Sequence, residues 1–206
     1  MMCLLLLLFN VFFGAVIAQL YTPTASEGNG DITQPGRCPA YLPSFPGFEF
    51  PHLMIPISST APDTAFPNTD SPYITAADIS MIFNFDIPAS RKGQTCNMEF
   101  LLPNQTELST SSFQLAGING SFVFSLSVLG GGAVAGNTTY SNQPLQANPH
   151  GLPRTLHIEP GHAYAIGSTI CVPGKISITM SSPDSSLTWF QDWNQCAIGL
   201  FITYSP

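Results

Sequence analysis

Apolar and polar side chains alternate along most of the chain after Ile74, in short runs that end at Gly, Pro, Asn or Ser. Successive side chains of a β-strand point to opposite faces of a sheet, so a period of two predicts strands with one buried face. Short strands separated by turn residues are typical of β-sandwiches and barrels. We expect an all-β chain that folds as a single antiparallel β-sandwich, with strands at residues 79–87, 96–102, 122–128, 156–158, 164–166, 176–180, 187–193 and 198–204.

Prolines set the N-terminal part of the chain apart, because residues 39–72 contain eight of them. Proline interrupts helices and is excluded from central strands. We therefore expect an extended Pro-rich arm that lies along the sandwich, with residues 52–58 pairing as an edge strand. Residues 19–37 contain few large apolar side chains and predict a flexible tail. The expected organisation is a signal peptide at 1–18, a flexible Pro/Gly-rich arm at 19–49 and a sandwich domain at 50–206.

The first residues resemble a secretory leader. Residues 3–16 are almost wholly apolar, a length that suits the core of a signal peptide and is short for a membrane span. Val16 and Ala18 occupy the −3 and −1 positions of a cleavage site, which makes Gln19 the expected first residue of the mature chain. A short signal anchor is the alternative. The C-terminal residues form no lipid-anchor signal, so the predicted location is the extracellular space or the cell wall, without a membrane anchor.

Four cysteines remain after the predicted cleavage, and an even number in a secreted chain predicts two disulfides. Three pairings are possible. The favoured one joins Cys96 to Cys171, both in expected core strands, and Cys38 to Cys196, which ties the arm to the last strand. No C-x-x-C motif occurs that would favour a zinc ribbon or a redox site.

Three N-glycosylation sequons, at Asn104, Asn119 and Asn137, fall at expected turns and predict a glycoprotein. Charged residues make up only 8% of the chain, and the net charge is −7. Nucleic acids and anionic membranes are bound by clustered Lys and Arg, so neither is an expected partner. Low charge with attached sugars suits an extracellular wall or matrix.

Several chemistries lack their sequence requirements. His157, Glu159 and His162 are close in sequence, but the intervening Pro160-Gly161 turn disfavours a shared metal. The glycine-rich residues 130–136 lack the Lys-Ser/Thr of a phosphate-binding loop and predict a mobile hairpin loop. Copper-dependent polysaccharide oxidation requires His at the mature N-terminus, where Gln19 is expected. No G-x-S-x-G motif is present. We predict no catalytic residue, cofactor or metal.

Acidic and aromatic side chains come together in residues 182–194. Asp184 and Asp192 are the acids of this segment, and a carboxyl group beside Trp suits glycoside hydrolysis or sugar binding. The alternative is a structural role, in which Asp192 accepts backbone hydrogen bonds in a buried corner and the two Trp rings belong to the core. Trp189, Asp192 and Trp193 are therefore the candidate ligand contacts.

The same region carries a family resemblance. Residues 189–194, Trp-Phe-Gln-Asp-Trp-Asn, followed by Ile-Gly-Leu-Phe-Ile at 198–202, resemble the end of a fungal secreted domain family known as the C-terminal domain of a ubiquitin-3-binding protein, the But-two type. Weaker blocks occur in order at 52–57, 83–88, 95–103, 160–161 and 171–174, so the resemblance spans about residues 50–206. It implies a β-sandwich and no catalytic residues. Its name implies a ubiquitin-pathway partner, whereas a leader, sequons and paired cysteines indicate an extracellular protein.

Three functions follow. The leading hypothesis is a non-catalytic extracellular or wall protein that binds wall polysaccharide or an extracellular protein. The second is a carbohydrate-active hydrolase that uses Asp192 or Asp184. The third is the ubiquitin-pathway binding protein that the family name implies.

Overall fold

Twelve strands make up the part of the chain that the computed structural model describes, residues 38–127, 131–146 and 152–206. The expected leader, its cleavage site and the tail at 19–37 lie outside these residues. The described residues contain no α-helix, only two 3-10 turns at Ala89–Arg91 and Gln105–Glu107. The strands are β1 Phe48–Glu49, β2 Leu53–Ser58, β3 Tyr73–Ile74, β4 Ile79–Ile87, β5 Thr95–Leu102, β6 Phe113–Gly117, β7 Ser121–Ser127, β8 Arg154–His157, β9 His162–Ile170, β10 Gly174–Ser181, β11 Ser185–Trp189 and β12 Gly199–Ser205.

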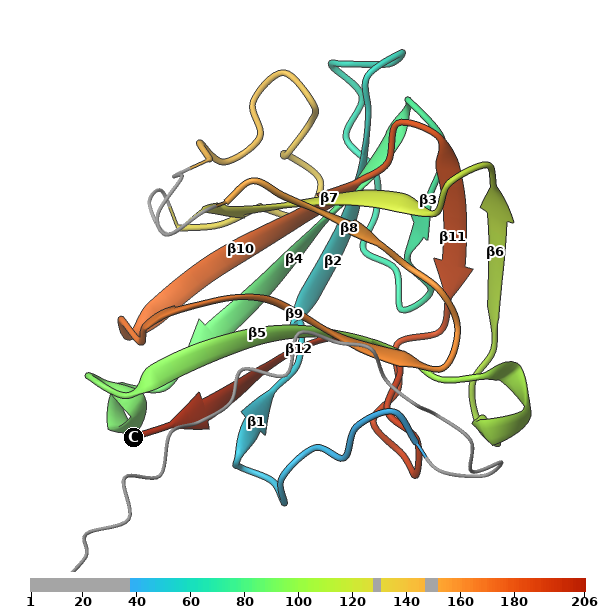
Figure 1. Ribbon diagram of the computed structural model, residues 1–206. Helices are drawn as coiled ribbons and strands as arrows, with labels where there is room; N and C mark the ends of the chain where they lie inside the picture. Colours follow the sequence, from blue (N-terminus) through green and yellow to red (C-terminus); the bar gives the residue numbers. More distant parts are fainter. Residues whose placement is uncertain (1–37, 128–130, 147–151) are drawn as a thin grey trace, which may run out of the picture. The chain divides into compact units, whose positions relative to one another are not determined.

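Two larger sheets face each other, with strand orders β1-β12-β5-β9 and β2-β4-β10-β7-β8 (Figure 1). A third, smaller sheet has the order β3-β11-β6 and lies at one end of them. All paired strands are antiparallel. The predicted all-β, antiparallel sandwich is confirmed.

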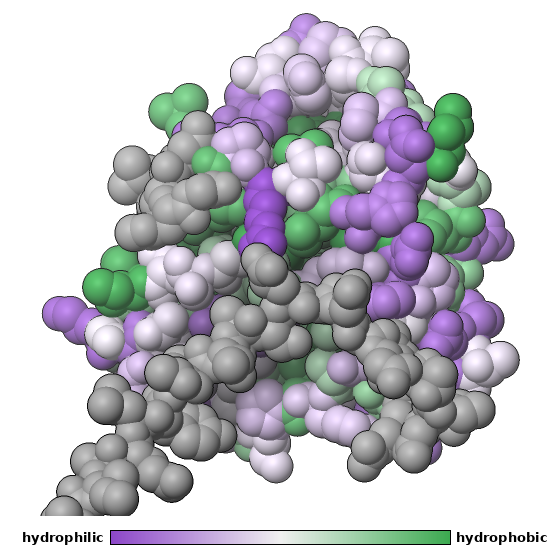
Figure 2. Space-filling view, viewed as in Figure 1, coloured by the Kyte–Doolittle hydropathy of each residue, from purple (hydrophilic) through white to green (hydrophobic). Residues whose placement is uncertain are grey.

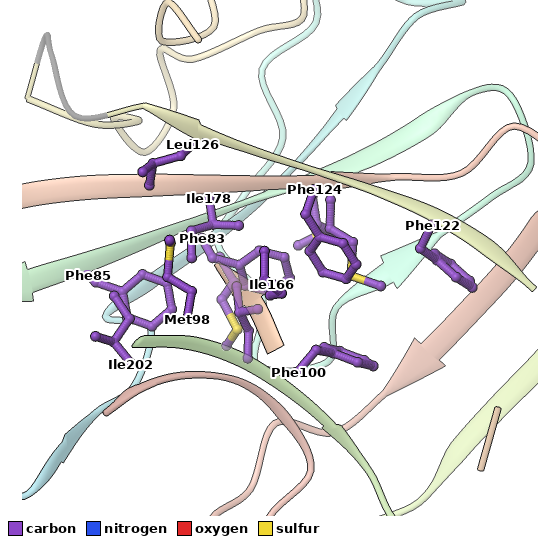
Figure 3. Close-up of a cluster of buried hydrophobic side chains, with 14 of the residues drawn as sticks. Phe83, Phe85, Met98, Phe100, Phe122, Phe124, Leu126, Ile166, Ile178 and Ile202 are labelled. Atoms are coloured by element: carbon purple, nitrogen blue, oxygen red, sulfur yellow. The ribbon is translucent and has the colours of Figure 1, made fainter. Parts of the chain in front are cut away.

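The main core fills the space between the two larger sheets (Figure 3). Phe83 and Phe85 of β4 project from one sheet toward Phe100 of β5 and Ile202 of β12 in the other, and all four side chains are at most 1% exposed. These residues come from the period-two runs, because alternate side chains of a strand share one face. The sequence pattern thus identified the inner face of both sheets.

The outer face of the β2–β4 sheet is also buried. Ile55, Ile57 and Ile82 form a second cluster with Ala133 from the glycine-rich segment. Asn84, which is 1% exposed, holds that segment in place: its amide donates to the Ala133 carbonyl (2.7 Å) and its carbonyl accepts from the Ala133 N–H (3.0 Å). The expected mobile loop is therefore anchored at Ala133.

The Pro-rich arm joins both sheets. Residues 52–58 were expected to form an edge strand, and β2 occupies the edge of its sheet, where the missing N–H of Pro56 is tolerated. Residues 38–49, assigned to the arm, include β1, which pairs with β12 in the register Phe48↔Thr203. Phe48 packs there against Phe201 and Leu101 on the outer face of the other sheet.

Three strands were not predicted, β1, β3 and β6, and the expected strand at 187–193 is too long. β11 ends at Trp189, and the chain then forms a loop before β12. On the face seen in Figure 2, polar and apolar residues are interspersed. In the described residues, no helix is long and apolar enough to span a membrane.

Candidate functional site

The loop between β11 and β12, residues 190–198, displays Trp193, whereas Trp189, the last residue of β11, is buried. An isolated bridge closes the loop, with hydrogen bonds from Ile198 N–H to the Asp192 carbonyl (2.9 Å) and from Asp192 N–H to the Ile198 carbonyl (3.3 Å). Asp192 Oδ1 accepts the Asn194 N–H (3.0 Å), and Oδ2 accepts the Thr110 hydroxyl. These bonds end β11 and hold Trp193 at the loop surface, where it is 48% exposed.

Trp189 lies on the core side of this loop and is 1% exposed. Its ring packs against Phe83 and Phe100, with centroids 5.9 and 5.5 Å away. Its indole N–H donates to Gln191 Oε1 (3.2 Å), which also accepts the Leu200 N–H (3.1 Å). The assignment of Trp189 as a ligand contact is wrong, because core packing removes its ring from the surface.

Trp193 instead joins a stack of rings from the Pro-rich arm. Phe50 lies 4.4 Å from Trp193 between ring centroids, at an interplanar angle of 24°, and 5.0 Å from His52, at 7°. His52 Nε2 lies 2.7 Å from Glu49 Oε1, and its Nδ1 lies 3.9 Å from Asp86 Oδ2. The stack is therefore fixed at one end by carboxylates and at the other by the closed loop.

A cleft of about 530 Å³ lies beside this stack. Such a volume is typical of sites for small ligands or a few sugar units. Its walls are built from the arm and the β11–β12 loop: Phe50, Pro51, His52, Met54, Asp70, Phe190, Gln191, Asp192, Trp193 and Asn194. Of the three candidate ligand contacts, the structure brings Asp192 and Trp193 together in one cleft.

The site includes residues that the sequence analysis did not select. Phe50, His52 and Asp70 are more than 120 positions away from Trp193 in the chain. Phe50 belongs to the Pro-rich segment, and only the pairing of β1 with β12 brings it beside the loop. The clustering of aromatic residues among the prolines at 45–50 was the one signal available.

Asp184 does not line this cleft and has a structural role. Its carboxylate accepts hydrogen bonds from the Ser185 hydroxyl (2.8 Å), the Asn119 amide (3.2 Å) and the Ser121 N–H (3.2 Å). These donors, with the Ser185 hydroxyl foremost, lower the pKa of Asp184 below its ordinary value of 3.8. Asp184 thereby ties the connection between β6 and β7 to the start of β11.

This bonding predicts how Asp184 affects acid stability. A lowered carboxyl pKa in the folded state contributes stability that is present above pH 3.8 and is lost as the pH falls through the folded-state pKa. We expect Asp184→Asn to unfold at a lower urea concentration than the native chain at neutral pH. Below about pH 3.8 the two unfolding midpoints should come closer together, because the native chain then loses the contribution of the Asp184 carboxylate. Urea unfolding at pH 7, 4 and 3 measures this, with Asp63→Asn, at an exposed site, as the control. A gap that stays constant with pH would contradict the assignment.

The other candidate side chains do not assemble into a site. His157 pairs with Glu159 (3.1 Å), whereas His162 Nδ1 meets the Pro160 carbonyl (3.0 Å). Within the described residues, no three His, Cys, Asp or Glu side chains are placed to hold a metal. The sequon residues Asn104, Asn119 and Asn137 are all exposed.

Both disulfides favoured from the sequence are present. Cys96–Cys171 joins the start of β5 to the end of β9, and Cys38–Cys196 ties the arm to the β11–β12 loop, with a Cα–Cα distance of 5.1 Å in each. Disulfides persist in oxidising compartments, so the two bonds fit a secreted protein.

Comparison with protein-family models identifies the family of this chain. Residues 49–195 match the model of the ubiquitin 3 binding protein But2 C-terminal domain. The chain belongs to this family. The But2 match begins at Glu49 in β1 and includes the cleft from Phe50 to Asn194, but it ends before Cys196 and β12. The But2 resemblance expected over about 50–206 is confirmed for most of that range. No curated protein sequence matches the chain.

Proposed function

We propose that this But2 domain is a non-catalytic binding module of a secreted glycoprotein, and that its ligand, a polysaccharide of a wall or matrix, binds in the cleft at Trp193. The observation that carries the proposal is the half-exposed Trp193 ring at the edge of the cleft, which stacks on Phe50, while Phe50 in turn stacks on His52. A large aromatic ring is ordinarily buried, as Trp189 is, because its burial contributes strongly to stability. An exposed ring that neighbouring contacts hold in place is typical of a binding surface.

A stacked ring suits a sugar ligand. The flat C–H face of a pyranose packs against an aromatic face, while polar groups around it take the hydroxyls. The cleft offers the carboxylate of Asp70 and the side chain of Asn194 for this purpose. The rings lose little conformational freedom on binding, because the stack already orders them.

Extracellular placement is supported by the two disulfides and by the exposure of all three sequon asparagines. Sugars on these asparagines would also supply polar surface to a chain in which charged residues make up only 8%.

Loss of the Trp193 ring is expected to weaken polysaccharide binding strongly. The native chain should be retained on at least one of insoluble chitin, chitosan, β-glucan or cellulose, and Trp193→Ala should lose about tenfold or more of that retention, since stacking on an aromatic ring is worth a kcal/mol or more. Tyr140→Ala is the matched control, because Tyr140 is also a partly exposed aromatic (39%) and does not line the cleft. Retention of the native chain on none of the four polymers would overturn the proposal.

A carbohydrate-active hydrolase is the second candidate, favoured by one observation. Asp70 and Asp192 line the same cleft, and glycoside hydrolysis uses two carboxyl groups. However, Asp192 is 6% exposed and both of its oxygens accept bonds from the loop and from Thr110. Asp184 contributes to no such pair, since it lies outside the cleft. Release of new reducing ends from any polymer, lost in Asp192→Asn, would establish the hydrolase.

The family name gives a third candidate, a ubiquitin-related partner. Such a partner is cytosolic or nuclear, where disulfides are rarely maintained. We expect immobilised ubiquitin to retain none of the oxidised, glycosylated protein.

A further inference from the structure

We propose that the cleft selects glycans that carry free amino groups, such as a β-1,4-linked glucosamine polymer. This inference rests on the proposed function, because it names the sugar class that the same cleft takes. It follows from the distribution of charge around the aromatic stack.

The cleft is acidic. Among the described residues that line it, two are Asp and none is Lys or Arg. The single histidine, His52, has the carboxylates of Glu49 and Asp86 beside it. Glu49 is 8% exposed. The pKa of Tyr204 is raised to about 12, first by the burial of the Tyr204 hydroxyl and second by the negative charge of Glu49. A polyanionic glycan would meet repulsion at this surface, and the chain's net charge of −7 adds to it.

Asp192 is a buried carboxylate, and its hydrogen-bond partners among the described residues are all neutral. It is 6% exposed, and it accepts bonds from the Thr110 hydroxyl and the Asn194 N–H. No described cation forms a salt bridge with it. Buried carboxylates are generally paired with a positive charge. The unpaired negative charge of Asp192 therefore adds to the attraction that the cleft exerts on a positively charged ligand.

Asp70 provides a second, more accessible carboxylate. Its side chain is exposed and makes no hydrogen bond within the described residues, while its backbone carbonyl accepts the Gln191 N–H (3.2 Å). The backbone bond holds Asp70 against the β11–β12 loop. Its carboxylate is therefore held at the cleft and is free to bind a ligand.

The aromatic rings add to this preference. A cation close to the face of a Trp ring is attracted by the negative potential of that face. A glucosamine unit offers both a C–H face for stacking and an ammonium group for the rings and carboxylates. A neutral sugar offers only the first, so the amino group is the feature that distinguishes ligands here.

The test compares two soluble oligosaccharides of equal length, glucosamine hexamer and N-acetylglucosamine hexamer, titrated against the full secreted chain by calorimetry at a pH where the amines are charged. We expect the glucosamine oligomer to bind at least about fivefold tighter at low salt, with a smaller ratio at 0.5 M NaCl, since salt screens charge pairs. Asp70→Asn should reduce the ratio severalfold, because it weakens binding of the glucosamine oligomer far more than binding of the acetylated oligomer. Asp63→Asn, an exposed carboxylate outside the cleft, should leave the ratio unchanged.

Each outcome separates this inference from the proposed function. Equal affinities for the two oligomers would overturn the amine preference and leave polysaccharide binding intact. A preference for the glucosamine oligomer that is unchanged in both Trp193→Ala and Asp70→Asn would also overturn the inference, because the attraction would then come from the net negative charge of the chain and not from the cleft. Binding of neither oligomer, together with no retention on any insoluble polymer, would overturn both proposals. Tighter binding of an oligogalacturonate would contradict the acidic character assigned to the cleft.

Discussion

Replacing Cys96 and Cys171 together with alanine is expected to lower the free energy of unfolding by about 4 kcal/mol. The bond closes a loop of 75 residues in the unfolded chain, and restricting a loop of that length accounts for an effect of this size. In the folded state both half-cystines are at most 2% exposed, and the backbone already places them, with Cys171 N–H bonded to the Gln94 carbonyl (2.7 Å). The disulfide therefore joins strands that hydrogen bonds have aligned.

Thermal and urea unfolding of the double variant measure this effect, with an expected decrease of roughly 10 °C in the unfolding temperature. The matched comparison is Cys38→Ala with Cys196→Ala, which frees the arm and the β11–β12 loop and should weaken ligand binding as well as stability. A decrease below about 1 kcal/mol in the Cys96/Cys171 variant would show that this bond does not stabilise the sandwich.

Gly199→Ala is expected to destabilise the domain by about 3 kcal/mol or more. Gly199 has φ +110°, a region that side chains rarely adopt, and a Cβ there would lie 1.9 Å from Gln191 Oε1 and 2.7 Å from Trp189 Nε1. Gln191 is 7% exposed, and its side-chain amide bonds both the N–H and the carbonyl of Leu200, so it has no room to move. The substitution would break the hydrogen bonds that support the floor of the cleft.

Gly93→Ala is the control for this prediction. Gly93 has φ +81°, and a Cβ there would meet nothing within 4 Å, so only the backbone cost applies, about 1 kcal/mol. Urea unfolding gives the loss of stability in each variant, and the difference between the two losses measures the clash of the new Cβ with Gln191 apart from the backbone strain. Equal losses would mean that the Gln191 network does not restrict Gly199.

The inner core was predictable from the sequence because one physical rule governs it. Phe83 and Phe85 are two positions apart, as are Met98 and Phe100, so the same face of each strand is buried. The rule fails where a second layer covers the outer face. Ile82 and Asn84 lie on that face and are buried because Ala133, nearly 50 residues later, packs over them. No local pattern reports such a distant contact.

The candidate site was half predictable for a similar reason. Asp192 and Trp193 were selected because an acid beside Trp is suggestive in any context, and both line the cleft. Trp189 carried the same signal, yet β11 continues through it and turns its ring into the core. Phe50, His52 and Asp70 reach the cleft only through the pairing of β1 with β12 and of β2 with β4, which depends on the whole fold.

The two tryptophans provide the most direct test of the claim that the ligand binds at Trp193. The chain contains only these two, so the indole N–H region of a ¹⁵N-resolved NMR spectrum should show two side-chain signals. On titration with glucosamine hexamer, we expect the signal of exposed Trp193 to move with the binding curve. The signal of Trp189, buried and bonded to Gln191, should stay in place. Calorimetric binding with an unmoved Trp193 signal would contradict the account, because the sugar would then occupy another surface.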